Sequence, residues 1–403
     1  MRRIAVIGGG AAGCFAAVEI ARRCPEDEVT VFEAGHRLMS KLSVTGGGRC
    51  NITNDFNGIR DIREAYPRGG HLIRRALAEF SHTDCLEWFG REGVSFVTQS
   101  DHCIFPESQD AMQIVHTLEN AMRREGVKIE CSSAVTSIEE GFILHLRDSV
   151  READVVLVTT GGGALGMLSP LNLRVENPVP SLFTFRLDDP ALSSLMGTTV
   201  PETVLLIPGT RFRSSGILLV TDWGISGPAT LKLSSYAARY LAESGYRAPL
   251  LINWTSETEE ECRKWITQSC LSDRTLQNLH PDGISERLWT HILVRAGLKP
   301  TGRWRELGRN GINRLAAVIT GDEYRISGRA AFKEEFVTCG GVSLDEINPS
   351  TMESKRFKGL FFAGEVLDID AVTGGFNLQA AWSTAFCAAR GIFNFSPPSS
   401  SYM

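Results

Sequence analysis

The chain has 403 residues, of which 43% are hydrophobic and 22% charged, and its formal net charge at pH 7 is −5. This is ordinary globular composition with room for two or three domains, and a mild negative charge without a basic run argues against a nucleic-acid-binding surface. No apolar stretch approaches the roughly 20 residues that span a bilayer. The ten cysteines include no C-x-x-C pair and the eight histidines show no ligand spacing, so we expect a cytoplasmic protein with reduced thiols and no metal site.

The first predicted elements form a strand–helix–strand unit. A buried strand over residues 4–7 enters a G-x-G-x-x-G turn, an apolar helix follows to Ala21, and a second strand over 29–32 ends in Glu33. A glycine turn with a strand before it, a helix after it and an acid roughly 20 residues further on is typical of a dinucleotide-binding site. A simple glycine turn would leave the position of Glu33 unexplained.

Each glycine of this turn has a physical role. Gly8 permits the tight turn, Gly10 lets the backbone approach a pyrophosphate, and Gly13 allows close packing of helix on strand. The helix N-terminus offers free N–H groups and a positive dipole end to the phosphates. Glu33 can accept hydrogen bonds from a ribose diol. The sequence therefore predicts where the adenosine and the phosphates of a dinucleotide bind.

Helices and strands alternate in the rest of the first region. The pattern predicts helices over 70–90 and 109–125 and strands over 127–131, 142–147 and 153–158, the last leading to Gly161-Gly162-Gly163. Such alternation is typical of a mostly parallel sheet covered on both faces.

The pattern changes at about residue 180. Prolines separate short strand-like pieces, which favours an antiparallel β domain, and Pro228 is placed as a first-turn helix proline. Ser256-x-x-Glu259 suits a capping box, and apolar spacing predicts helices near 258–270, 284–296 and 303–319. We interpret this part as a small helical insert.

The α/β pattern returns after about residue 335. A buried strand is predicted over 359–366, and the glycine turn at 373–379 leads into a last helix that ends near Gly391. The ends of the chain should therefore build one domain. The predicted division is 1–180 with 335–403 for the nucleotide-binding domain, 181–255 with 318–334 for an inserted β-rich domain, and 256–317 for the helical insert.

Four motifs are spread over nearly the whole chain, and the fourth of them has two segments. They are Gly46–Asn54 (GGGRCNITN), Gly224–Pro228 (GISGP), Thr351–Lys355 (TMESK), and Gly364–Asp368 (GEVLD) together with Thr373–Gln379 (TGGFNLQ). Together they resemble the BaiN-like, or aminoacetone-oxidase-like, family of NAD(P)/FAD-dependent oxidoreductases. The resemblance implies an α/β fold of the glutathione-reductase-like class: a discontinuous Rossmann-like FAD-binding domain, an inserted antiparallel β domain and a small helical insert. Relatives commonly carry a histidine before the GISGP motif, where this chain has Thr221-Asp222-Trp223, so no role is carried over there.

The resemblance also implies FAD as the cofactor and NAD(P)H as a transient electron donor. It places the ADP half of FAD at Gly8, Gly10, Ala11, Ala12, Gly13, Glu33 and Ala34, and adenine at the backbone of Val135. It places the pyrophosphate, ribityl chain and flavin ring at Lys41, Gly46, Gly47, Gly48, Arg49, Gly161, Gly162, Gly364, Glu365, Gly374, Gly375, Phe376, Asn377 and Leu378.

Three features have two interpretations each. The run from Gly161 to Gly166 also matches G-x-G-x-x-G, but Pro170 opposes a sustained helix, so a turn approaching FAD is favoured over an NAD(P)H site. Cys50 lacks a nearby cysteine, which excludes a disulfide reductase and leaves a catalytic thiol or a packed residue. Arg49 is a candidate catalytic cation or a member of a structural salt bridge.

We therefore expect an FAD-dependent oxidoreductase that transfers a hydride through flavin N5 on a small organic substrate, by reduction of an activated C=C bond or by amine oxidation. One alternative is a flavin-dependent RNA-modifying enzyme, which a basic patch would favour. Another is a non-catalytic FAD-binding redox protein. No nucleic-acid or membrane partner is expected, and the sequence does not indicate an oligomeric state.

Overall fold

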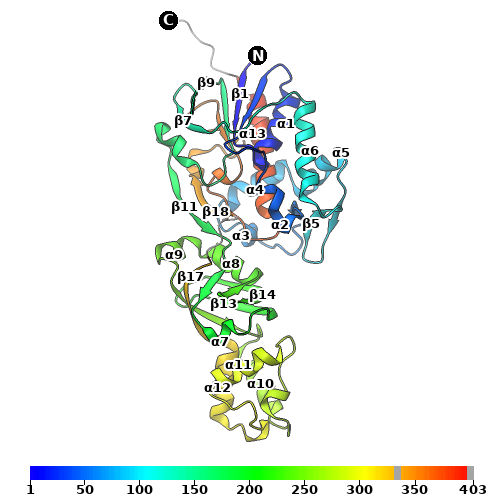
Figure 1. The fold of residues 1–403 in the computed structure, drawn as a ribbon, viewed down its shortest axis with the longest axis vertical. Helices are drawn as coiled ribbons and strands as arrows, with labels where there is room; N and C mark the ends of the chain where they lie inside the picture. Colours follow the sequence, from blue (N-terminus) through cyan, green and yellow to red (C-terminus); the bar gives the residue numbers. More distant parts are fainter. Residues whose placement is uncertain (331–336, 397–403) are drawn as a thin grey trace. The chain divides into compact units, whose positions relative to one another are not determined.

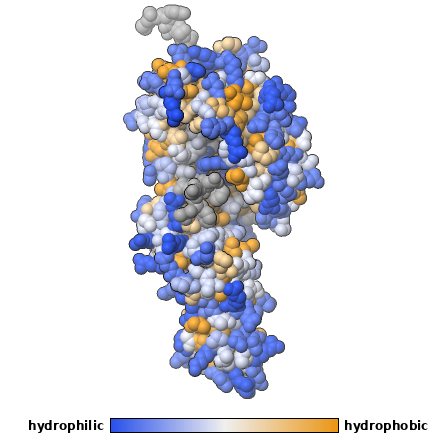
Figure 2. Space-filling view, viewed as in Figure 1, coloured by the Kyte–Doolittle hydropathy of each residue, from blue (hydrophilic) through white to orange (hydrophobic). Residues whose placement is uncertain are grey.

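The computed structural model describes residues 1–330 and 337–396. The chain forms two compact units, Met1–Val179 with Val337–Met403 and Pro180–Phe336 (Figure 1). The first unit is thus built from both ends of the chain. Among the described residues, no helix combines the length and the apolar character that crossing a bilayer requires. Figure 2 shows mixed hydrophilic and hydrophobic residues on the visible face.

A five-stranded parallel sheet lies at the centre of the first unit, in the order β19-β10-β1-β2-β6. Its strands are β1 (Arg3–Ile7), β2 (Glu28–Phe32), β6 (Lys128–Glu130), β10 (Val155–Val158) and β19 (Leu360–Phe362). β10 and most of β1 and β2 are buried, as expected for parallel strands covered by helices. The predicted parallel sheet is confirmed.

The helices α1 (Ala11–Arg23) and α13 (Phe376–Asn394) pack against each other beside this sheet (Figure 1). Each begins directly after a glycine, Gly10 for α1 and Gly375 for α13. Their packing brings the first and the last glycine turn of the chain into one unit.

One predicted helix in this unit is divided in two, and one predicted strand is present but belongs to another sheet. The helix expected over 70–90 is two helices, α4 (Gly70–Glu79) and α5 (His82–Arg91), because Ser81 starts a new helix through a capping box with Asp84. The strand expected over 142–147 does not join the parallel sheet. It forms an antiparallel sheet of β7 (Val135–Glu139), β8 (Ile143–Leu146) and β9 (Val150–Glu152).

The remaining elements of this unit are short except for one helix. They are α2 (Thr45–Gly48), α3 (Ile62–Ala65), α6 (Ala111–Arg124), the antiparallel strands β3 (Thr53–Asn54), β4 (Phe96–Thr98) and β5 (Cys103–Pro106), and the pair β11 (Val175–Ser181) with β18 (Val337–Val342).

The second unit contains a closed six-stranded barrel in the order β12-β15-β14-β13-β16-β17. All six strand pairings that close the barrel are antiparallel, which confirms the predicted antiparallel β domain. Its strands are β12 (Phe185–Leu187), β13 (Thr199–Leu206), β14 (Arg213–Thr221), β15 (Gly224–Ser226), β16 (Ala248–Asn253) and β17 (Asp322–Arg329).

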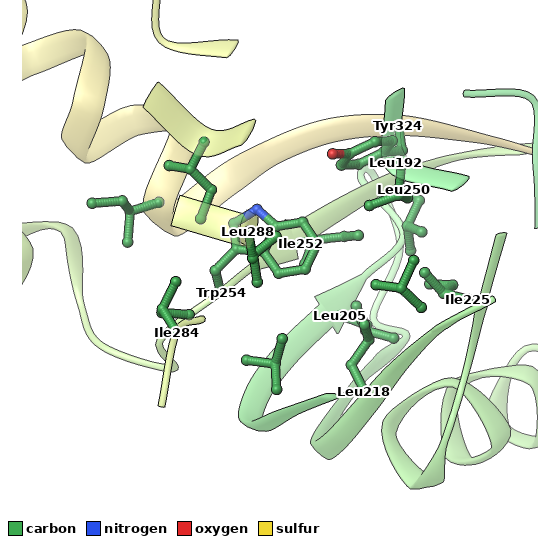
Figure 3. Packing of buried hydrophobic residues seen from close by; sticks show 14 of the residues in the cluster. Leu192, Leu205, Leu218, Ile225, Leu250, Ile252, Trp254, Ile284, Leu288 and Tyr324 are labelled. Atoms are coloured by element: carbon green, nitrogen blue, oxygen red, sulfur yellow. The ribbon is translucent and has the colours of Figure 1, made fainter. Parts of the chain in front are cut away.

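The helices of this unit are α7 (Pro190–Ser193), α8 (Pro228–Tyr236), α9 (Ala238–Glu243), α10 (Glu259–Ser269), α11 (Glu286–Arg295) and α12 (Arg309–Gly321). Pro228 occupies the first turn of α8, as expected. The capping box of α10 uses Thr258 and Glu261, not the predicted Ser256 and Glu259. Side chains from α10, α11, α12 and the barrel share one hydrophobic core around Trp254 (Figure 3). The predicted separation of 256–317 as its own insert stays a prediction.

Candidate cofactor site

The glycine turn between β1 and α1 leaves no room for side chains at two of its positions. Gly8 has a φ of +108°, and a Cβ there would lie 2.7 Å from the carbonyl oxygen of Thr159. A Cβ at Gly13 would lie 1.9 Å from the carbonyl oxygen of Gly8. A Cβ at Gly10, in contrast, would meet nothing within 4 Å. The turn is therefore closed toward the protein and open at Gly10, where a ligand can approach the backbone.

The N-terminus of α1 has no side-chain cap. Its first-turn N–H groups at Ala11, Ala12 and Gly13 lack intrahelical acceptors and suit an external anion. At the end of β2, the carboxylate of Glu33 accepts hydrogen bonds from the N–H groups of Gly9 (2.8 Å) and Gly35 (2.6 Å). The acid is thereby fixed against the glycine turn.

The segment before β7 runs beside Glu33. The N–H of Ser133 donates to the carbonyl oxygen of Glu33 at 2.8 Å, and half-buried Val135 begins β7 two residues later. Ala34 follows Glu33 on the same turn. This position of Val135 suits its predicted backbone contact with adenine, which stays a prediction.

The second glycine turn precedes α13. Gly375 has a φ of +86°, and a Cβ there would lie 2.4 Å from the carbonyl oxygen of Thr53. The Thr53 hydroxyl donates to the side chain of Gln379 at 2.6 Å, and the Asn54 amide donates to the carbonyl oxygen of Gly374 at 3.0 Å. The GGGRCNITN segment thus holds the start of α13, which accounts for the presence of both motifs.

Some of the groups that were predicted to bind the cofactor at the start of α13 form hydrogen bonds within the protein. With the Asn51 amide oriented to satisfy both its atoms, its oxygen accepts from the N–H of Gly375 at 3.1 Å. The Asn377 side chain bonds both the N–H and the carbonyl oxygen of Ala371, at 2.9 and 3.1 Å. The helix has no side-chain cap, so the N–H groups of Phe376, Asn377 and Leu378 suit an external acceptor.

The two ends of the chain meet at Gly364. Its φ is +76°, and a Cβ there would lie 2.9 Å from the Cβ of Ala12 in α1. The N–H of Gly364 donates to the Thr384 hydroxyl of α13 at 2.9 Å. Gly364 therefore lies where α1 and α13 approach each other.

Glu365 brings three other predicted residues together. Its carboxylate accepts from the N–H of Thr338 at 2.6 Å and lies 3.9 Å from Lys41 Nζ. A Cβ at Gly161 would lie 3.3 Å from that carboxylate, and one at Gly162 would clash with Thr338. Burial raises the pKa of Glu365, and the charge of Lys41 opposes the shift. This cluster suits the polar chain of a cofactor.

The GGG turn before Cys50 is open. Gly46, Gly47 and Gly48 all have positive φ, and a Cβ at Gly47 or Gly48 would meet nothing within 4 Å. The Arg49 guanidinium carbon lies 4.4 Å from the centre of the Phe105 ring. Its Nε–H donates to the carbonyl oxygen of Gly46 at 3.3 Å. Among the described residues it forms no ion pair, so the structural salt bridge is not observed.

Cys50 is fully buried. Burial raises the pKa of its thiol to about 12, although a hydrogen bond with Thr45 opposes this shift. The thiol is therefore neutral near pH 7, which favours the packed residue over the catalytic thiolate.

The second glycine motif does not open an α-helix. Residues Leu165–Leu171 form a 3-10 helix that contains Pro170. This supports the glycine-turn interpretation and gives no support to a separate NAD(P)H site.

Long-range pairs could not be recognised from the sequence. The Tyr66 hydroxyl donates to the carbonyl oxygen of Phe376 at 2.8 Å, and Arg68 forms a largely buried ion pair with Asp370. Asp370 is thus an ion-pair partner of Arg68. No local pattern marks Tyr66, Arg68 or Thr338.

The family model described as the HI0933-like protein Rossmann domain matches residues 2–391. The chain belongs to this family. Its members are FAD-dependent oxidoreductases, which confirms the family resemblance and the Rossmann fold with an inserted antiparallel domain.

Two full-length relatives carry different activities in their names. The chain is 29% identical to a ribosomal RNA dihydrouridine synthase of Haemophilus influenzae, over 96% of this chain and 97% of the relative. It is 28% identical to a 3-dehydro-bile acid delta(4,6)-reductase of Clostridium scindens, over 97% and 98%. The name of the Haemophilus relative describes an activity on RNA. The net charge of −5 therefore does not by itself exclude a nucleic-acid partner for members of this family.

A 3-ketosteroid delta1-dehydrogenase of Sterolibacterium denitrificans is similar in structure. The TM-score is 0.52 at 12% identity, with 98% of this chain and 100% of that chain covered. At this identity the likeness shows the fold alone.

Proposed function

We propose that the chain is an FAD-dependent reductase that transfers a hydride from flavin N5 to a C=C bond conjugated with a carbonyl group in a small organic substrate. The observation that carries this proposal is the placement of two uncapped helix N-termini, α1 and α13, with the open GGG turn and exposed Arg49 in one compact unit. The names of both relatives describe hydrogen added to a C=C bond, which supports the reaction class.

The residues divide the binding of FAD between them. The N-terminus of α1 receives the pyrophosphate, Glu33 accepts from the adenosine ribose, and the start of α13 faces the pyrimidine side of the ring. A helix N-terminus favours a negative charge there by about 1 kcal/mol. Lys41 and Glu365 line the ribityl–phosphate part of FAD, between its adenosine and its flavin ring.

Arg49 serves the substrate in this proposal. When hydride adds to the carbon β to the carbonyl, the C=C electron pair moves toward the carbonyl oxygen, and a proton from solvent then adds at the α carbon. An exposed guanidinium held over Phe105 can stabilise that oxygen as it becomes negative. Cys50 has no part in this step.

Anaerobic spectroscopy of the holoprotein tests the reaction class. NADH and NADPH titrations give the donor. Photoreduced protein is then mixed with a 3-keto-4-ene steroid or with uridine, and oxidised protein is mixed separately with benzylamine. We expect the enone to reoxidise the flavin faster than buffer does. Reduction of oxidised flavin by benzylamine would instead favour amine oxidation. If neither a nicotinamide nor any substrate changes the flavin spectrum, the chain is a non-catalytic FAD-binding protein.

A second candidate, an RNA-modifying enzyme, has one structural observation in its favour. Between residues 299 and 314 five basic side chains are exposed against one acidic side chain, Glu306. The basic residues are Lys299, Arg303, Arg305, Arg309 and Arg314. Arg305 pairs with Asp273. A uridine-containing RNA that reoxidises the reduced flavin, when free uridine does not, would favour this candidate.

A further inference from the structure

The loop that leads into α13 is held by the short connection between α3 and α4, residues 66–69. The N–H of Val372 donates to the carbonyl oxygen of Ala65 at 2.8 Å, and Arg68 forms a largely buried ion pair with Asp370. The helices that follow these two segments, α4 and α13, pack against each other (Figure 1). The connection is therefore fixed against the start of α13.

Tyr66 lies in this connection and is fully buried. Its hydroxyl donates to the carbonyl oxygen of Phe376, the first residue of α13, at 2.8 Å. Its ring packs edge-on against the Phe376 ring, with the ring centres 5.9 Å apart. Burial raises the pKa of the Tyr66 hydroxyl, so the hydroxyl keeps its proton at neutral pH. It is thus a fixed hydrogen-bond donor at the first peptide group of the helix.

The carbonyl group of Phe376 does not need this donor. In an α-helix each carbonyl accepts from the N–H four residues further on, and only the last four carbonyls lack such a partner. The Tyr66 hydroxyl is therefore a second donor to this oxygen. The Phe376 C=O and the Asn377 N–H belong to one planar, conjugated peptide group. A donor at the oxygen draws electrons from the nitrogen, and linked hydrogen bonds strengthen one another by about 10–30%.

The Asn377 N–H lies at the open end of α13. The N–H of Gln379 donates to the carbonyl oxygen of the N-cap residue, Gly375, at 3.0 Å, which closes the first helical turn. The N–H of Asn377 precedes this bond and has no acceptor among the residues that the structure describes. The Asn377 side chain bonds both backbone groups of Ala371, which holds the residue in place. In the proposed function this N–H faces the pyrimidine side of the flavin.

We infer that Tyr66 is a positioning residue for the flavin: its hydroxyl polarises the first peptide group of α13 and so strengthens the Asn377 N–H that meets the ring. The inference rests on the proposed function, because it takes the pyrimidine side of FAD to lie at this helix start. That side carries the negative charge when the ring is reduced. A stronger donor there favours the reduced form, so loss of the Tyr66 hydroxyl should make the bound flavin harder to reduce.

A purely structural role makes a different prediction. A buried tyrosine hydroxyl usually has a hydrogen-bond partner, and in a structural role the Phe376 carbonyl only satisfies the hydroxyl. Loss of the hydroxyl then changes stability and leaves the reduction of the flavin unchanged. The reduction equilibrium therefore separates the two roles, whereas a melting temperature alone does not.

Tyr66→Phe in the full-length, FAD-loaded protein tests the inference, since it removes the hydroxyl and keeps the ring packed on Phe376. Flavin content and melting temperature are measured first. The protein is then reduced anaerobically with a redox dye present, and the ratio of reduced to oxidised flavin is read at a fixed ratio of reduced to oxidised dye. We expect the flavin ratio to fall about two- to tenfold, the effect of part of one hydrogen bond. An unchanged ratio in a variant that retains FAD would overturn the inference and leave the proposed function intact.

The matched control is Ser383→Ala. The Ser383 hydroxyl is buried in the same helix, about two turns further on, and donates to the carbonyl oxygen of Phe80 at 2.7 Å. We expect the flavin ratio of this variant to equal that of wild type. An equal fall in both variants would show a general loosening of α13 and would overturn the inference.

A second replacement keeps the inference testable if Tyr66→Phe loses FAD or folds poorly. An ortho-fluorinated tyrosine in place of Tyr66 is a stronger donor of almost the same shape, because fluorine draws electrons from the ring. We expect it to raise the ratio of reduced to oxidised flavin. A ratio equal to or below that of wild type would overturn the inference. If the wild-type chain itself binds no FAD, the proposed function fails and the inference fails with it.

Discussion

A Cβ at Gly364 would lie 2.9 Å from the Cβ of Ala12, so the first and last nucleotide-binding motifs of the chain are in contact through these two residues. Gly364 also needs its positive φ of +76°. The contact explains why a glycine follows β19 at position 364: any side chain there would meet Ala12 and push α1 away.

Glu33 should contribute to FAD affinity. Charge-assisted hydrogen bonds contribute about 1.5–3 kcal/mol, so Glu33→Ala should weaken FAD binding about ten- to a hundredfold. Glu33 also accepts from Gly9 and Gly35, and the variant must be shown to melt near wild type. Fluorescence titration of apoprotein with FAD gives the dissociation constant. An unchanged constant would mean that the acid only braces the turn.

Gly375→Ala should displace the start of α13. The added Cβ would lie 2.4 Å from the Thr53 carbonyl oxygen, in addition to the cost of positive φ, which is about 1–2 kcal/mol. Gly209→Ala is the matched control, because Gly209 has a φ of +74° and open space around its Cβ position. We expect a larger drop in melting temperature and in bound FAD for Gly375→Ala. Equal effects of the two substitutions would show that the close approach to Thr53 is unimportant.

Arg49→Ala should slow hydride transfer more than it weakens FAD. Arg49 forms no ion pair among the described residues, and its stack on Phe105 contributes only about 0.5–1 kcal/mol at an exposed site. Loss of a cation that stabilises a developing oxyanion costs about a hundredfold or more in rate. Stopped-flow reoxidation of reduced protein by an enone measures this. Phe105→Leu retains the cation and should keep most of the rate; a wild-type rate in Arg49→Ala removes Arg49 from the chemistry.

Cys50 should make stability depend on pH in the alkaline range. Its thiol pKa rises from 9.0 to about 12 on folding, so the folded state keeps its proton longer than the unfolded state. This contribution is complete below pH 9 and is lost as the pH rises from 9 toward 12, by at most about 1.4 kcal/mol per pH unit. Denaturant unfolding of Cys50→Ala should show a shallower fall over this range. A slope equal to that of wild type would mean that Cys50 is accessible to solvent.

Sequence patterns predicted the parts of the fold that depend on neighbouring residues. The G-x-G-x-x-G turn lies between β1 and α1, Glu33 follows β2, and a glycine turn precedes α13, as the local patterns predicted; their contacts with a cofactor stay predictions. The helix break at Ser81 was missed because the apolar spacing continues across it, although Ser81 and Asp84 are a capping pair.

Contacts between distant parts of the chain could not be predicted. Arg68 with Asp370 and Thr338 with Glu365 are polar pairs that only the folded sheet brings together. Closure of the barrel depends on strand register between β12 and β17, which alternation of apolar residues does not determine.

The most direct measurement is the amount and identity of flavin bound by the full-length chain. The protein is reconstituted with FAD, freed of excess, denatured, and the released nucleotide is identified and counted. We expect one FAD per chain, bound by the turns at Gly10 and Gly375 together. Release of no flavin, or only of a nicotinamide nucleotide, would contradict the assignment of this site.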